Sequence, residues 1–422
     1  MKPSEKGWLK QYLDFRKELL GNLTSEKRKF THPEYSLYKV IQPTGLMYGH
    51  AAEVLDIPNQ KDWNEKDKMK LLLAESLISS SILFHDKPVN NEDDLSDIMV
   101  KTLESIANFY NNVFPELATP FKSLFGKRKS PLELAEKILD KRIEKKSDFS
   151  GNFWIQFFHN SLLFLDIFIF GQWIHTNADR IVSDFFKYER EELRFSVVKI
   201  IATAAHANNK IEFEERKLFD FFLQSAGLSP EKKHEAVQIF EQGIEVESIN
   251  LPTNNSWLLK KYFLEMAILT IWADKKVEET ENEFLLRLCY YLDFKEEDLE
   301  NSMIAIEGFV LEHWEELDYL QNKQDYNEVS ERFIKRLSKL TETHKNTIIN
   351  EMKDSKELMS LLHKAKVNEL AEDEKIKLQV LMVTVLKTIP TFVIISLPQR
   401  YLTLPVLLKI LPSNIFSESL GG

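Results

Sequence analysis

Cysteine and glycine are both scarce in this chain of 422 residues. The single cysteine, Cys289, excludes an internal disulfide and a cysteine-rich zinc site. The 12 glycines fall well below the roughly 7% of an average protein. Glycine is the ordinary residue that destabilises a helix most. Few glycines beside many leucines, glutamates and lysines therefore predict an all-α fold, a multi-unit helical bundle.

A net positive charge is also missing. The formal charge is -11 at pH 7 and the pI is near 5.6, so we expect no nucleic-acid partner, because phosphate neutralisation requires a basic surface. The mean hydropathy of -0.30 excludes a polytopic membrane protein. The N-terminus has no apolar signal segment. We therefore expect a protein that is not secreted and lies in the cytoplasm or on the cytosolic face of the inner membrane.

The common enzyme motifs are absent as well. There is no Gly-rich phosphate loop, no Gly-x-Ser-x-Gly elbow and no His-Glu-x-x-His helix, and we recognise no small-molecule substrate. His50 with the pair His85-Asp86 resembles the constellation of HD-type hydrolases, in which a bound metal activates water. The run 93–97 fits an aspartate-rich magnesium motif, but it also fits a helix N-cap. We expect a non-enzymatic protein, with a metal hydrolase as a minor alternative.

One internal stretch, residues 153–174, is apolar and long enough to span a bilayer. Gln156, His159, Asn160 and Asp166 recur at roughly helical spacing and form one polar stripe. An aspartate inside a membrane needs a partner. We therefore expect a buried core helix, and the alternatives are a helix lying in the membrane plane or a spanning helix.

A helix–loop–helix pattern occurs twice, 66 residues apart, around Asn208 and Asp274. Each copy has a small-residue helix end, a polar turn, one aliphatic residue and an acidic start to the next helix. Two copies indicate a pseudo-symmetric domain rather than a solenoid.

The repeated pattern resembles the TerB-like domain of tellurite resistance over about residues 188–300. That family carries Ala-Asp-Gly-Lys-Ile-Asp-x-x-Glu at such turns within a compact helical bundle, and its acidic turn residues are associated with divalent cations. The resemblance implies a site for a cation such as calcium at Asp274, Glu281, Glu215 and Asn208. A glutamate in a first helical turn also stabilises the helix by itself, so capping and packing are the alternative interpretation.

Prolines interrupt an apolar C-terminal segment at intervals of seven to eight residues: Pro390, Pro398, Pro405 and Pro412. Between residues 389 and 411 the only charged residues are Arg400 and Lys409. Proline removes a backbone donor and bends a helix. The pattern predicts a proline-kinked apolar helical segment.

This segment resembles the membrane segment of the LETM family, the leucine-zipper/EF-hand-containing transmembrane proteins, over about residues 366–417. The residues that match that family's pattern are Leu370, Glu374, Lys387 (for an arginine), Pro390, Pro398, Leu404, Pro405, Lys409, Pro412 and Phe416. Tyr401 stands where that family has an acidic residue, so the resemblance supports membrane association better than cation–proton exchange. It implies membrane contact through residues 386–412. The alternative is that kinked helices of this segment are buried in a soluble bundle.

These patterns divide the chain into four parts. They are a helical N-terminal unit of unknown type (1–186), a TerB-like bundle (187–300), amphipathic linker helices (301–365) and a LETM-like apolar tail (366–422). We expect a non-enzymatic, membrane-associated helical protein with a role in cation homeostasis or envelope stress. The alternative is a soluble helical interaction or scaffold protein with a protein partner, ribosome-associated by family analogy.

Overall fold

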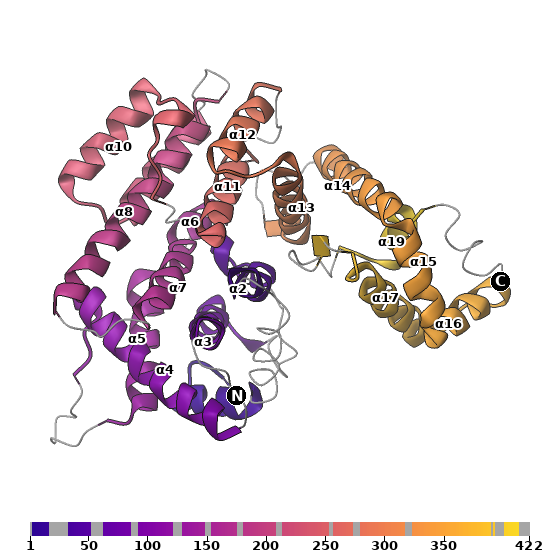
Figure 1. The fold of residues 1–422 in the computed structure, drawn as a ribbon, viewed down its shortest axis with the longest axis horizontal. Helices are drawn as coiled ribbons and strands as arrows, with labels where there is room; N and C mark the ends of the chain where they lie inside the picture. The colour runs from indigo at the N-terminus through magenta and orange to yellow at the C-terminus, as the bar shows by residue number, and fades with distance from the viewer. Residues whose placement is uncertain are drawn as a thin grey trace. The chain divides into compact units, whose positions relative to one another are not determined.

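The fold is all-α, as the composition predicts. The computed structural model describes residues 2–16, 33–51, 62–85, 92–120, 129–147, 153–174, 180–207, 213–252, 256–272, 279–316, 323–389, 391–392 and 401–412. These residues contain 17 α-helices and no strand (Figure 1). The chain separates into two compact units, Met1–Asp293 and Phe294–Gly422.

The first unit holds eleven of these helices. They are α2 (Pro33–Ile41), α3 (Glu65–Leu83), α4 (Glu92–Val113), α5 (Pro131–Lys146), α6 (Phe153–Asn160), α7 (Leu162–Trp173), α8 (Arg180–Ala204), α9 (Phe213–Ser225), α10 (Pro230–Gln242), α11 (Trp257–Trp272) and α12 (Glu279–Tyr291). Local sequence signals determine where some of these helices begin. The Ser130 side chain and Glu133 form a capping box at α5, with a proline between them at the first helical position.

The apolar stretch from Phe153 to Trp173 forms α6 and α7 inside the first unit. It is the one stretch among the described residues that is long and apolar enough to cross a membrane, and 83% of its most apolar window is buried. Its aspartate, Asp166, is fully buried and accepts a hydrogen bond from Arg142 Nε at 2.6 Å. The expectation of a core helix with a partnered aspartate therefore agrees with the packing.

Helix α8 is the central element of the first unit. It packs against α4, α7, α9, α10 and α11. It runs without interruption through residues 186 and 187, where the sequence predicts the boundary between the first two parts. The division into four parts stays a prediction.

A buried carboxylate ties α11 to the N-terminal helices. Glu265 on α11 is fully buried and accepts hydrogen bonds from the hydroxyls of Tyr38 at 2.5 Å and Tyr48 at 2.8 Å. Lys261 Nζ lies 3.8 Å from the same carboxylate. Burial and the neighbouring carboxylate raise the pKa of both tyrosines well above its ordinary value, so their hydroxyls stay protonated as donors.

Gly49 lets the chain pass directly over α6. Its φ is +71°, and a Cβ there would lie 2.7 Å from the carbonyl oxygens of Gln156 and Phe157. The next residue, His50, stacks on Phe153 at 3.9 Å between ring centroids, and its Nε2 lies 2.9 Å from the Phe153 carbonyl oxygen. His50 is therefore held as a core residue.

The second unit contains α13 (Glu296–Glu312), α14 (Lys323–Thr343), α15 (Lys345–Asp354), α16 (Lys356–Val367), α17 (Glu372–Leu386) and α19 (Leu404–Ile410). Helix α14 packs against α13, α15 and α19, and α17 packs against α15, α16 and α19. Figure 1 shows these helices in orange to yellow.

The described part of the C-terminal tail is packed into the second unit. Leu402 and Leu407 are fully buried. The Gln379 side chain donates to the Leu402 carbonyl oxygen at 3.0 Å, and the Thr341 hydroxyl donates to the carbonyl oxygen of Ile410. Tyr401 packs against the ring of Phe333 at 5.4 Å. This part of the tail matches the alternative in which it is buried in a helical bundle.

The residues assigned to a membrane segment differ in their surroundings. Pro412 is buried, Leu404 is half-buried, and Pro405 and Lys409 are exposed on α19. Pro390 and Pro398 lie outside the described residues. Membrane contact through residues 386–412 stays a prediction.

Candidate functional site

The helices that follow the two predicted turns are α9 and α12. Helices α9 and α12 are both 13 residues long and begin 66 residues apart. Glu215 and Glu281 are each the third residue of these helices, and both are buried, at 5% and 2% exposure. The third position is where a glutamate can reach back to the start of its own helix.

The predicted cation site stays a prediction. Asp274 and Asn208 lie outside the described residues, so only Glu215 and Glu281 can be placed. In the part of the chain that the structure describes, no group of three or more histidine, cysteine, aspartate or glutamate side chains is arranged to hold a metal ion.

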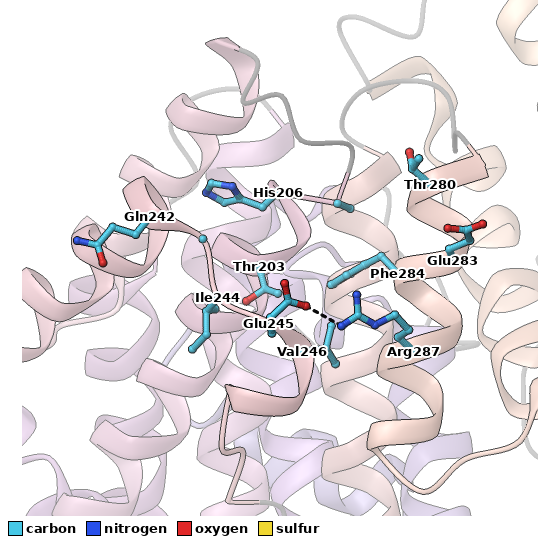
Figure 2. A pocket seen from close by; sticks show the side chains of 12 residues that line it. Thr203, His206, Gln242, Ile244, Glu245, Val246, Thr280, Glu283, Phe284 and Arg287 are labelled. Carbon is cyan, nitrogen blue, oxygen red and sulfur yellow. Dashed lines mark hydrogen bonds and ion pairs between the residues drawn. The ribbon is translucent and has the colours of Figure 1, made fainter.

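A cavity of about 450 Å³ opens beside α12 in the first unit (Figure 2). We call it the α12 groove. Its walls include Thr203 and His206 at the end of α8, Glu245 and Val246 after α10, and Glu283 and Arg287 on α12. Glu215 and Glu281 do not line it.

An exposed arginine fixes one wall of the α12 groove. Arg287 Nη2 donates to Glu245 Oε2 at 2.7 Å and to Glu247 Oε2 at 2.8 Å, and Figure 2 shows Arg287 and Glu245 pointing toward one another. The hydrogen bond from Arg287 lowers the pKa of Glu247, and the two carboxylates raise the pKa of Arg287. Solvent screens such exposed pairs, so they position the segment after α10 more than they stabilise the fold.

The opposite wall depends on a glycine and a histidine. His206 Nε2 lies 2.5 Å from the Phe240 carbonyl oxygen. Because a carbonyl only accepts, Nε2 carries the proton and Nδ1 is left as an acceptor in the neutral ring. Gly243 has a φ of +73°, and a Cβ there would lie 3.3 Å from His206 Nδ1. The chain can leave α10 this close to His206 only with glycine in this position.

The floor and the rim of the α12 groove differ in chemistry. Phe284 and Val246 are buried, at 7% and 2% exposure, and form an apolar floor. Gln242, Glu245 and Glu283 are exposed at the rim. A concave site with an apolar floor and a few charged groups is suited to binding a side chain or a small ligand.

The sequence did not identify this groove. Its defining pair, Glu245 and Arg287, is 42 residues apart, and neither residue belongs to a recognisable motif. The one local signal was Gly243 directly after α10, since a glycine at a helix end often takes a positive φ.

The enzyme patterns give no assembled site among the described residues. His50 is hydrogen-bonded to backbone and stacked in the core, and Asp86 lies outside the described residues. Asp93 and Asp97 are exposed within the first turns of α4, where acidic side chains stabilise the helix start.

The chain is similar in part to one curated protein of named function. It is 27% identical over 124 residues to the co-chaperone protein DjlA of Vibrio cholerae, a match that covers 27% of this chain and 44% of that protein. The chain thus spans less than half the length of this relative. No family model matches the chain, and no solved structure matches it. The relative is named as a co-chaperone, in agreement with the expectation of a non-enzymatic protein.

Proposed function

We propose that this chain is a non-enzymatic helical adaptor of the co-chaperone type that engages a protein partner through the α12 groove. The observation that carries the proposal is the similarity over 124 residues to a protein named as a co-chaperone. The groove adds a concave surface, and Arg287 forms ion pairs with Glu245 and Glu247 at one of its walls.

The TerB-like resemblance at residues 188–300 supports a role for this protein in cation homeostasis or envelope stress. The equal lengths of α9 and α12 and the similar burial of Glu215 and Glu281 support the resemblance. A cation such as calcium would bind at Asp274, Glu281, Glu215 and Asn208. In this proposal it would stabilise the bundle that carries the groove.

The LETM-like resemblance at residues 366–417 supports association with the cytosolic face of a membrane. Because Leu402 and Leu407 are buried within the second unit, we propose a peripheral contact rather than an integral anchor. A carbonate wash of membranes containing the full chain tests this point. We expect release into the supernatant. Retention in the pellet would contradict a peripheral contact.

The co-chaperone activity is tested by refolding. A denatured reporter such as luciferase is refolded by a bacterial ATP-dependent chaperone with and without the full chain. We expect a higher yield with the chain and a loss of this gain in Glu283→Lys, which reverses a charge at the rim of the α12 groove. The matched control is Glu231→Lys at the exposed start of α10, which should keep the gain. An unchanged yield with the wild-type chain would contradict the proposal.

A second candidate function is a soluble scaffold protein without membrane contact, ribosome-associated by family analogy. The burial of the described tail residues favours it. In the carbonate experiment such a protein would be in the soluble fraction before the wash.

A further inference from the structure

We infer that the α12 groove binds a cationic side chain, arginine or lysine, presented by a segment of a partner protein. This inference rests on the proposed function, because it names the chemistry of the partner that the groove would engage. The inference goes beyond the proposed function by assigning separate roles to the rim and to the floor of the groove.

The charges of the groove favour a cation. Glu245 and Glu283 line the cavity, and Glu247 stands beside it on the same segment as Glu245. Arg287 is the one guanidinium among the described lining residues, and it is paired with Glu245 and Glu247. Among the described residues none forms an ion pair with Glu283. Three carboxylates therefore stand beside one guanidinium, which leaves two negative charges, and an added cation would neutralise one of them.

The floor fits the rest of such a side chain. Arginine and lysine carry three or four methylene groups that pack on apolar surface while the charged head reaches solvent or a carboxylate. Phe284 and Val246 line the cavity with apolar side chains, although only 7% and 2% of these residues is exposed. A cavity of about 450 Å³ holds one long side chain and part of its backbone.

The rim can also recognise the backbone of the partner. Gln242 and Thr280 are exposed lining residues with hydrogen-bonding side chains, and each can donate and accept. A peptide offers backbone groups to both, whereas a free polyamine does not. This difference assigns the cation to a polypeptide rather than to a small amine.

The experiment measures fluorescence anisotropy of a labelled heptapeptide whose one charged side chain is a central arginine, titrated with the full chain. The matched peptide has glutamine in place of arginine. We expect the glutamine peptide to bind at least about tenfold more weakly, which corresponds to about 1.4 kcal/mol. Higher salt should weaken the arginine peptide more than the glutamine peptide, because exposed charges are screened. Equal binding of the two peptides would overturn the inference.

Two variants of the chain test whether the peptide binds in the α12 groove. Glu283→Gln should weaken the arginine peptide by about tenfold, while Glu231→Gln, which changes the net charge equally, should leave it unchanged. An equal loss in both variants would show attraction to the acidic chain as a whole and overturn the inference. Spermidine should compete less well than unlabelled peptide, and the reverse order would contradict a polypeptide ligand.

This outcome is separable from that of the refolding assay. If the arginine peptide binds at Glu283 but refolding is unchanged by the chain, the groove has a cationic ligand and the co-chaperone role is wrong. If refolding improves and Glu283→Gln has no effect on the peptide, the cation assignment is wrong and the co-chaperone role stands.

Discussion

Arg142 and Asp166 form an ion pair that is withdrawn from water, with 2.6 Å between Nε and Oδ2 and side-chain exposures of 2% and 0%. Tyr110 donates to the same carboxylate at 3.3 Å, and Arg194 Nη2 lies 3.7 Å from its other oxygen. One aspartate on α7 thus faces two arginines, Arg142 from α5 and Arg194 from α8. Burial lowers the pKa of Arg194 to about 10, which still leaves it charged at neutral pH.

We expect Asp166→Asn to destabilise the chain by about 3–5 kcal/mol, because removing one partner of a buried pair leaves an uncompensated charge. Urea unfolding followed by circular dichroism measures the change. The control is Asp14→Asn, which breaks the Lys10–Asp14 pair, whose side chains are 67% and 68% exposed. Exposed pairs contribute little. Equal effects of the two variants would show that the buried pair has no special role.

Gly49→Ala tests the close passage over α6. The added Cβ would meet the Gln156 and Phe157 carbonyl oxygens at 2.7 Å, so the backbone must shift in addition to adopting a strained positive φ. We expect a loss of soluble protein or a fall in melting temperature of many degrees. Gly7→Ala is the matched control, since Gly7 also has a positive φ of +85° but no atom within 4 Å of the added Cβ. It should lower stability by only about 1 kcal/mol.

Glu307 predicts a pH dependence of the second unit. Its carboxylate is buried, and Arg336 Nε lies 3.2 Å away. Burial raises the pKa of Glu307 from 4.5 to about 7, against the opposing attraction of Arg336 and Arg332. The folded state therefore holds its proton to higher pH than the unfolded state. The stabilisation from protonated Glu307 is complete below pH 4.5. As the pH rises toward 7, the free energy of unfolding falls by about 3 kcal/mol in all.

Glu307→Gln should flatten this decline, because glutamine carries no titrating proton. Urea midpoints of the wild type and the variant between pH 4.5 and 8 measure the effect. Glu351→Gln, at an exposed position of α15, should keep the wild-type slope. If the urea midpoints of the wild type and of Glu307→Gln fell equally steeply with pH, Glu307 would not be the source of the pH dependence.

Calcium tests the TerB-like site. We expect millimolar calcium to raise the melting temperature of the wild type by mass action, and Asp274→Asn combined with Glu281→Gln to abolish the rise. The control is the same double change at Glu296 and Asp298, exposed or half-exposed acids at the start of α13. No rise in the wild type would mean that Glu215 and Glu281 act in capping and packing alone.

The parts of the fold that local patterns determine were predictable. The scarcity of glycine predicts helices, and the equivalent positions of Glu215 and Glu281 anticipate the matching starts of α9 and α12. The polar stripe containing Asp166 predicted a core helix rather than a membrane span. In each case the deciding information lies within one or two turns of the chain, where spacing translates directly into a helix face.

The parts set by contacts distant in sequence were not predictable. Tyr401 and Phe333 pack together across 68 residues, so the apolar tail could not be assigned to a core from its composition alone. Burial in protein and burial in lipid select the same apolar side chains. The α12 groove depends likewise on the pair of Glu245 and Arg287, and surface pairs of this kind leave no periodic signal.

Helix α8 determines which helices of the first unit unfold together. Arg190 Nη1 donates to the Val113 carbonyl oxygen at the end of α4, at 2.9 Å, and Arg194 Nη1 donates to the Ala226 carbonyl oxygen after α9, at 3.2 Å. One helix therefore bonds to the ends of two others that lie far apart along the chain. In hydrogen exchange, the amides of α4, α8 and α9 should open as one cooperative unit. A protease that removes the N-terminal helices would then dismantle the α12 groove, although none of those helices lines it.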